Sequence, residues 1–193
     1  MSGSPIGRPD PSEYNPYFGR YIDLVHGDVI DALSTQIRGS LETLRRISGE
    51  DSRRRYAPDK WNIREIVGHL IDTERVFASR ALWFARGGPG ELPGMEQDDF
   101  AGAARSDDRE WNDLLSELEL LRRADVLMFR GLDREAWSRR GVASGSPISV
   151  RALAFNIAGH ELHHMKVIRE RYLPVLSLSP SAGRGSAKGF PLA

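Results

Sequence analysis

Four stretches of the chain carry apolar residues at the three- and four-residue spacing of an amphipathic helix. They span roughly residues 28–48, 62–86, 106–131 and 149–172 of the 193 residues. No series of segments alternates polar and apolar residues as strands do. Because helices with one apolar face bury it by packing together, the chain is predicted to be all-α, with a four-helix bundle architecture.

Residue types that begin helices stand at the start of these stretches. Asp28 and Ser149 can each accept a hydrogen bond from the first turn as N-caps, and Asn62 with Glu65 three residues later has the pattern of a capping box. The third helix is expected to begin at Ser106, because the two aspartates that follow suit the positive end of a helix dipole.

The bundle is expected to occupy residues 26–173. Residues 1–25 form an N-terminal arm, and their Pro, Gly, Ser and Tyr content predicts an extended or loosely docked chain. Glycine and proline in residues 88–105 predict a loop, and residues 132–148 read as a connection with one short turn. Residues 174–193 have no acid and little periodicity, which predicts a C-terminal tail.

Charge and cysteine content narrow the classes of function. Lys+Arg and Asp+Glu both number 27, so no net charge favours nucleic acid or an anionic membrane as a partner. No apolar run approaches the roughly 20 residues that span a bilayer. The absence of cysteine excludes disulfides, thiolate metal sites and cysteine nucleophiles, and it suits a cytoplasmic protein.

Three of the five histidines lie within five residues of the fourth predicted helix. His160 and His164 are one turn apart and therefore project from the same face. That face is otherwise apolar, because Leu153, Ile157 and Val167 continue it in both directions. Two adjacent buried imidazoles without a shared partner are costly, whereas a pair at this spacing can bind one metal ion. We therefore predict that another helix brings a third ligand to this pair.

The remaining histidines differ in their setting. His69 lies on or beside the apolar stripe of the second helix, where a hydrogen-bonded core histidine is the alternative to a ligand. His163 is rotated away from the pair and is expected to face solvent or the next helix. His26 precedes a capped helix start, which favours a structural or exposed position. The acids of the loop can rim a pocket or be simply solvated, namely Glu96, Asp98 and Asp99.

Residues 160–164 also satisfy the His-Glu-x-x-His pattern of zinc peptidases, in which the glutamate is the general base. Those enzymes usually take a third ligand from downstream, yet no Asp, Glu or His follows Glu170 in this chain. A standard zinc peptidase is therefore disfavoured. Glu161 is left with two interpretations, a residue that orients a metal-bound water or a solvated helix residue.

Three segments resemble the DinB-like superfamily. They are residues 56–65 (YAPDKWNIRE), 68–75 (GHLIDTER) and 158–164 (AGHELHH), and the resemblance covers roughly residues 28–172. It includes the tryptophan before a capped helix, the histidine on the second helix and the His-x-x-x-His on the fourth. The N-terminal arm and the C-terminal tail are not explained by it.

The resemblance implies a DinB-like four-helix bundle in which three histidines bind a divalent metal, zinc or nickel. Carried over by position, the ligands are His69, His160 and His164. Some relatives are thiol S-transferases that use bacillithiol or mycothiol, others are described as metal-dependent hydrolases, and homodimers are frequent. The implied function is activation of a low-molecular-weight thiol or of water against a small electrophile; the alternative is a non-catalytic metal- or ligand-binding stress protein. No catalytic residue is assigned.

Overall fold

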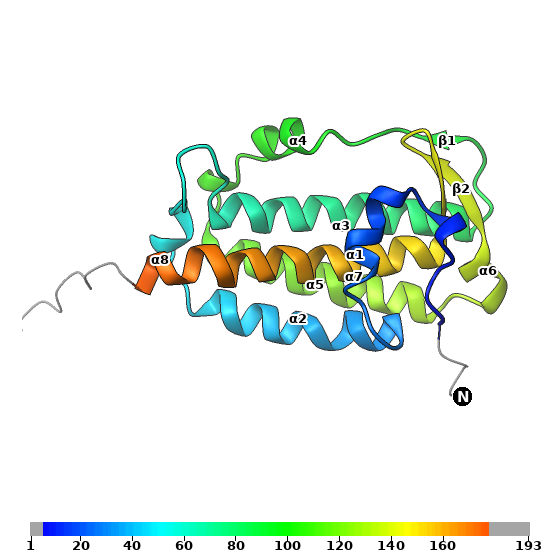
Figure 1. Ribbon diagram of the computed structural model, residues 1–193, viewed down its shortest axis with the longest axis horizontal. Coiled ribbons are helices and arrows are strands. Elements are labelled where there is room, and N and C mark those ends of the chain that lie inside the picture. Colours follow the sequence, from blue (N-terminus) through cyan, green and yellow to red (C-terminus); the bar gives the residue numbers. More distant parts are fainter. Residues whose placement is uncertain (1–5, 178–193) are drawn as a thin grey trace, which may run out of the picture.

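Four long helices lie side by side in the computed structural model, which describes residues 6–177 (Figure 1). They are α2 (Val29–Arg45), α3 (Ile63–Ala85), α5 (Trp111–Arg130) and α7 (Val150–Val167). Helices α2 and α3 each pack against both α5 and α7, so the four form a closed bundle. The predicted all-α four-helix bundle is confirmed. No helix within residues 6–177 combines the length and the apolar composition needed to cross a bilayer.

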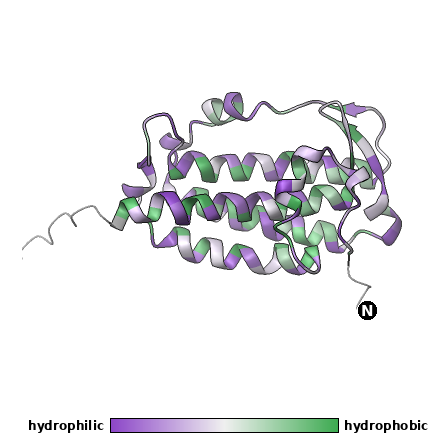
Figure 2. Ribbon diagram, viewed as in Figure 1, coloured by the Kyte–Doolittle hydropathy of each residue, from purple (hydrophilic) through white to green (hydrophobic). Residues whose placement is uncertain are grey.

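Polar and apolar residues alternate around each long helix, as Figure 2 shows. The buried apolar side chains form two clusters, one near each end of the bundle. One cluster includes Leu33, Phe84 and Phe129, and the other includes Leu44 and Leu114. Between the two clusters lies a layer of buried polar side chains, which is described below.

Three of the four predicted helix starts are confirmed. The side chain of Asp28 accepts from the first turn of α2, Ser149 accepts from Ala152 N, and Asn62 forms the expected capping box with Glu65. The prediction for the third helix is wrong.

Residues Ser106–Asp108 form only a 3-10 turn, η4, and α5 begins at Trp111. Arg105 has a left-handed backbone with φ 48°, and Arg109 and Glu110 are extended, which separates the turn from the helix. The capping residues therefore start a turn rather than the helix that follows it.

The two predicted connections contain regular structure. Residues 88–105 include β1 (Glu91–Leu92) and α4 (Gln97–Ala104), and Figure 1 shows α4 above α3. Residues 132–149 include three further elements, α6 (Arg134–Ser138), β2 (Arg140–Ala143) and β3 (Ser146–Ser149).

The connections between the long helices also contain three short strands, which the sequence patterns did not predict. A three-stranded sheet has the order β1-β2-β3, with β1 parallel to β2 (Glu91 opposite Val142) and β2 antiparallel to β3 (Arg140 opposite Ser149). Strands of two and four residues are too short to show a period of two in the sequence.

The N-terminal segment is packed rather than extended. It contains η1 (Pro11–Glu13), η2 (Pro16–Phe18) and α1 (Gly19–Ile22), and α1 lies along α7. The contact is so close that a Cβ on Gly159 would overlap the carbonyl oxygen of Tyr21. Residues 1–5 lie outside the described part of the chain.

At the other end of the bundle, α7 continues into a π-helical turn, η5 (Ile168–Tyr172), and then into α8 (Leu173–Ser177). Pro174 has no backbone N–H and cannot donate the hydrogen bond that continues an α-helix. The hydrogen-bond pattern changes to that of a π-helix in the turn before it. Most of the predicted tail, residues 178–193, lies outside the described residues.

Candidate metal centre

The three histidines that the sequence singled out converge between α3 and α7. His160 Nε2 lies 3.1 Å from His69 Nε2 and 3.0 Å from His164 Nε2. One ring nitrogen of each residue lies within 4.8 Å of the others. We call this group the histidine cluster. His69 and His160 are buried, whereas His164 is half-buried.

The sequence produces this arrangement through helix geometry. His160 and His164 share one face of α7 because they are four residues apart. The same face packs on α3, and His69 occupies the first half of α3, where that contact is made. The cluster therefore follows from the packing of two capped helices and requires no unusual backbone.

Neighbouring side chains contact the rings of His69 and His160. Thr73, one turn after His69 on α3, places its Oγ1 3.3 Å from His69 Nδ1, so a ring N–H at Nδ1 can donate to the hydroxyl. The Trp61 ring centroid lies 4.9 Å from that of His69, and the Tyr21 ring meets His160 edge-on at 5.2 Å. A proton at His69 Nδ1 leaves the lone pair of Nε2 pointing into the cluster.

Burial keeps the imidazoles neutral. It lowers the pKa of His69 to about 4 and that of His164 to about 3, and it lowers the pKa of His160 well below its usual range. The positive charge of one histidine would also disfavour a charge on the next. At neutral pH the cluster therefore presents uncharged nitrogen bases, which is the form that binds metal.

This geometry fits a metal ion better than it fits hydrogen bonding within the cluster. A neutral imidazole has one N–H and one lone pair, so three Nε2 atoms that face each other cannot all be hydrogen-bonded by one another. Nitrogens bound to tetrahedral zinc lie roughly 3.3 Å apart, close to the observed separations. Three protein ligands leave a coordination position for a small molecule.

A pocket of about 610 Å³ leads to the histidine cluster. His69 and His160 form part of its wall. Its other lining residues come from η2, α1, α3, the loop before α4, α4 itself and the β2–β3 turn, among them Phe18, Tyr21, Thr73, Phe77, Arg80, Met95 and Ser144. The acids predicted as a possible rim, Glu96, Asp98 and Asp99, also line it and are exposed. The volume is that of a small-molecule site.

A second pocket, of about 410 Å³, lies on the other side of the start of α4. His163 and His164 line it, and Gln97 and Asp98 belong to both pockets. The N-terminal end of α4 therefore lies between two openings that approach the cluster from different sides.

The interpretation of Glu161 as a solvated helix residue is wrong, and the residue lines neither of these two pockets. It is fully buried, and its Oε2 accepts hydrogen bonds from Arg122 Nη1 and from Gln36 Nε2, the latter at 2.7 Å. Arg122 also binds Glu74 through two bonds of 2.6 and 2.9 Å. We call this group of four side chains the arginine network. Each of the four long helices contributes one member.

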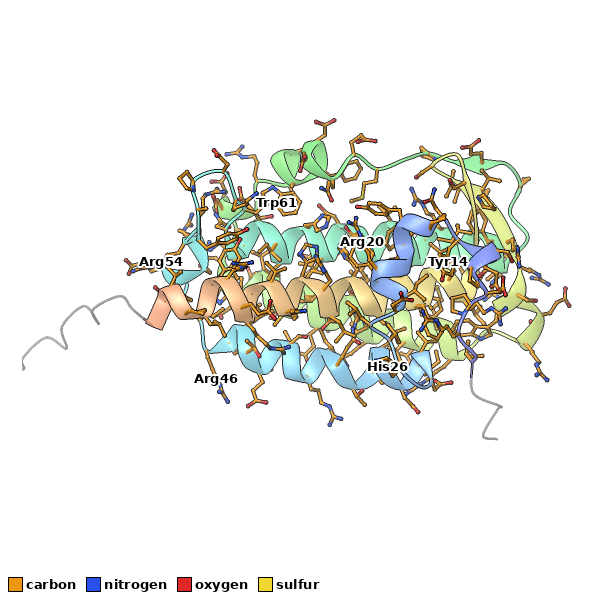
Figure 3. The ribbon with its side chains drawn as sticks, in the orientation of Figure 1. Tyr14, Arg20, His26, Arg46, Arg54 and Trp61 are labelled. Atoms are coloured by element: carbon orange, nitrogen blue, oxygen red, sulfur yellow. The ribbon has the colours of Figure 1, made fainter. Side chains whose placement is uncertain are left out.

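The other two histidines lie outside the cluster. His163 is half-buried, with its ring edge-on to those of Tyr21 and His164. His26 is exposed beside the start of α2, as expected (Figure 3). The sequence analysis did not identify Tyr21 and Arg80 as pocket residues, because it placed Tyr21 in the N-terminal arm and found no signal at Arg80.

Comparison with known proteins gives one family and one fold. The sequence profile of the DinB superfamily matches residues 32–168. No curated protein shows a significant match.

Among solved structures, the chain is similar to YfiT from Bacillus subtilis, described as a probable metal-dependent hydrolase with an unusual four-helix bundle topology. The TM-score is 0.65 at 16% identity, over 90% of this chain and 95% of that one. At this identity the match concerns the fold alone.

Proposed function

Since this chain belongs to the DinB superfamily, we propose that it is a metal-dependent enzyme whose His69, His160 and His164 bind one divalent ion, zinc or nickel. The observation that carries the proposal is the convergence of three neutral imidazoles, two buried and one half-buried, beside a pocket of about 610 Å³ that His69 and His160 line. A purely structural histidine group would need hydrogen-bond donors and acceptors in matched numbers, which three facing Nε2 atoms do not supply.

An ion bound in this way is a Lewis acid that favours the deprotonated form of a water or thiol in the pocket. The protein side chains bind the ion, orient the imidazoles and exclude bulk water. Thr73 orients His69, while Trp61 and Tyr21 cover His69 and His160 with aromatic rings. The proposed reaction is attack of that water or thiol on a small electrophile.

The nucleophile must come from outside the protein. The chain has no cysteine, and the glutamate of its His-Glu-x-x-His segment is bound to Arg122. If the nucleophile is a low-molecular-weight thiol, the protein is an S-transferase. If the nucleophile is water, it is a hydrolase. We also propose the homodimer that the family implies, which analytical ultracentrifugation would test.

Metal content tests the site. The protein is incubated with Zn²⁺ or Ni²⁺, desalted and measured by mass spectrometry. We expect about one ion per chain in the wild type and its loss in His69→Ala and in His164→Ala. His26→Ala is the matched control, because it removes an exposed histidine and should retain the ion. Equal occupancy in all four proteins would exclude the site.

Turnover then separates the possible functions. The metal-loaded protein is assayed with 1-chloro-2,4-dinitrobenzene and bacillithiol or mycothiol, and separately with 4-nitrophenyl acetate in water. Thiol-dependent turnover that is lost in His164→Ala supports the transferase, and ester cleavage without thiol supports the hydrolase. Stoichiometric metal with neither activity supports the alternative of a non-catalytic metal- or ligand-binding protein.

A further inference from the structure

Arg80 is a buried cation that no carboxylate of the described residues neutralises. It is 7% exposed, and burial lowers its pKa with no nearby acid to offset the effect among residues 6–177. The other strongly buried arginines are satisfied. Arg122 binds two glutamates, and all three guanidinium nitrogens of Arg64 donate to hydroxyl or carbonyl oxygens.

Only part of the Arg80 guanidinium is used within the protein. Nη2 donates to Pro93 O at 2.6 Å and to Ser144 Oγ at 3.2 Å. Within the described chain, neither Nε nor Nη1 has a hydrogen-bond partner, and Arg80 lines the pocket of the histidine cluster. The two bonds of Nη2 hold the planar group in place and leave its other N–H groups for a ligand.

Helix geometry sets the distance between Arg80 and the histidine cluster. His69, Thr73, Phe77 and Arg80 recur at intervals of four, four and three residues, so one stripe of α3 lines the pocket. Eleven residues of helix rise about 16 Å. The guanidinium leans back toward Phe77, with its central carbon 5.7 Å from the ring centroid, which shortens the gap to the order of 10 Å.

The acidic side chains of the pocket and the guanidinium of Arg80 lie apart from each other. Glu96, Asp98 and Asp99 are exposed on the loop and the first turn of α4, and the charge of Asp98 acts on the pKa of His69. None of these acids acts on the pKa of Arg80. The apolar side chains of Phe18, Phe77 and Met95 also line the pocket, and Phe77 lies between His69 and Arg80 on α3.

We propose that Arg80 binds a carboxylate of the substrate while the histidine end of the pocket receives its electrophilic carbon. The substrate class is then a small carboxylic acid in which an apolar segment of about 10 Å separates the two groups. A planar guanidinium with free N–H groups matches a carboxylate better than an ammonium does. The inference rests on the proposed function, because the second anchor is the ion at the histidine cluster.

Two chelating probes of equal length test this specificity. Suberic acid monohydroxamate carries a carboxylate at the end opposite its metal-binding group, and octanohydroxamic acid ends in a methyl group. Binding of each to the zinc-loaded protein is measured by calorimetry. The wild type is expected to bind the carboxylate probe about tenfold more tightly, because a charge-assisted hydrogen bond is gained in a dry site.

Arg80→Gln should abolish this preference, so that the two probes bind with about equal Kd values. The Kd of octanohydroxamic acid should stay unchanged. Arg80→Lys should keep part of the preference, because it retains the charge without the planar fork. Arg75→Gln is the control, since Arg75 is an exposed arginine of the same helix that pairs with Glu117 and does not line this pocket.

A merely structural Arg80 would weaken both probes equally in Arg80→Gln, and that result would overturn the inference. Equal binding of the two probes by the wild type also overturns it, without touching the proposed metal site. If the wild type retains zinc but binds neither probe, the open metal site and the inference both fail. Should Arg80→Gln not fold, the wild-type preference and its loss in high salt decide the question.

Discussion

The histidine cluster and the arginine network are two buried polar groups in the same layer of one bundle, yet they are satisfied differently. In the network, Arg122 lies between two carboxylates and its hydrogen bonds are short and direct. In the cluster, three neutral bases face each other and only Thr73 offers a hydroxyl at the edge. Two glutamates within the protein neutralise the charge of Arg122, although Glu161 Oε1 has no hydrogen-bond partner among the described residues, whereas the cluster is complete only with the ion that we propose.

The two groups also share their helices. Thr73 and Glu74 are adjacent on α3, and His160 and Glu161 are adjacent on α7. On both α3 and α7, one residue of the pair belongs to the arginine network and its neighbour lies at the histidine cluster. Because the network connects all four long helices, we infer that it fixes the rotation of α3 and α7 and so the direction of the histidines.

The largest effect is expected from Arg122→Met. It leaves Glu74 and Glu161 buried without a cation, and breaking a buried ion pair costs about 3–5 kcal/mol of the free energy of unfolding. Urea denaturation followed by circular dichroism measures this loss. Arg123→Met is the control, because Arg123 is the exposed neighbour, and should change the free energy by less than about 0.5 kcal/mol. Similar losses in the two variants would show that the network does not stabilise the fold.

Zinc should stabilise the wild type by a smaller amount. A free concentration 100-fold above the Kd adds about 2.7 kcal/mol to the free energy of unfolding, because only the folded protein holds the three ligands together. His164→Gln should remove this gain and leave the apoprotein close to the wild type, since His164 is only half-buried. Equal stabilisation of both proteins would place the zinc elsewhere and remove the difference between the two groups.

The histidines could be predicted because their signal is local. Two imidazoles four residues apart on an apolar stripe are informative without knowledge of the fold, and the family resemblance supplied His69. The caps of α2, α3 and α7 are also local, since a side chain bonds to a backbone two or three residues away.

The arginine network and Arg80 could not be predicted for the opposite reason. Glu161 reads as a solvated charge until α5 places Arg122 beside it, 39 residues away in sequence. Arg80 also resembles a solvated charge in the sequence. It is buried because the loop after β1 and the β2–β3 turn cover it in the fold. Burial of a charged residue depends on partners from distant segments, and periodicity within one segment does not contain that information.

Thr73→Val tests how far the cluster depends on its single hydroxyl neighbour. The change keeps the size of the side chain and removes the oxygen that accepts from His69 Nδ1. Loss of such an outer partner weakens metal binding about 10- to 100-fold, or roughly 1.4–2.7 kcal/mol, and the lower end is expected for one hydroxyl at 3.3 Å. Zinc competition with a chromogenic chelator measures the change.

Thr43→Val is the matched control, because Thr43 is a half-buried helical threonine far from the cluster whose hydroxyl donates to Gly39 O at 2.9 Å. Equal Kd values for zinc in the wild type and Thr73→Val would show that His69 is oriented by packing against Trp61 alone.

The last effect concerns the excess negative charge beside the arginine network and appears only as the pH rises. Burial and the charge of Glu74 raise the pKa of Asp125 to about 7, and Asp125 hydrogen-bonds Glu74 while its Oδ2 has no partner within the described chain. In the unfolded chain the pKa returns to about 3.9. Between these values the folded protein holds a proton that the unfolded chain has released, so stability falls as pH rises from about 4 to 7.

Asp125→Asn removes this pH dependence, because an amide donates to Glu74 without needing a proton. The variant should be more stable than the wild type at pH 8, by up to about 4 kcal/mol for a pKa difference of about three units, and equal to it at pH 4. Urea denaturation at the two pH values measures the difference. A gain of the same size at both pH values would mean that Asp125 is ionised throughout and that Arg122 neutralises three carboxylates, which would make the network as incompletely satisfied as the histidine cluster.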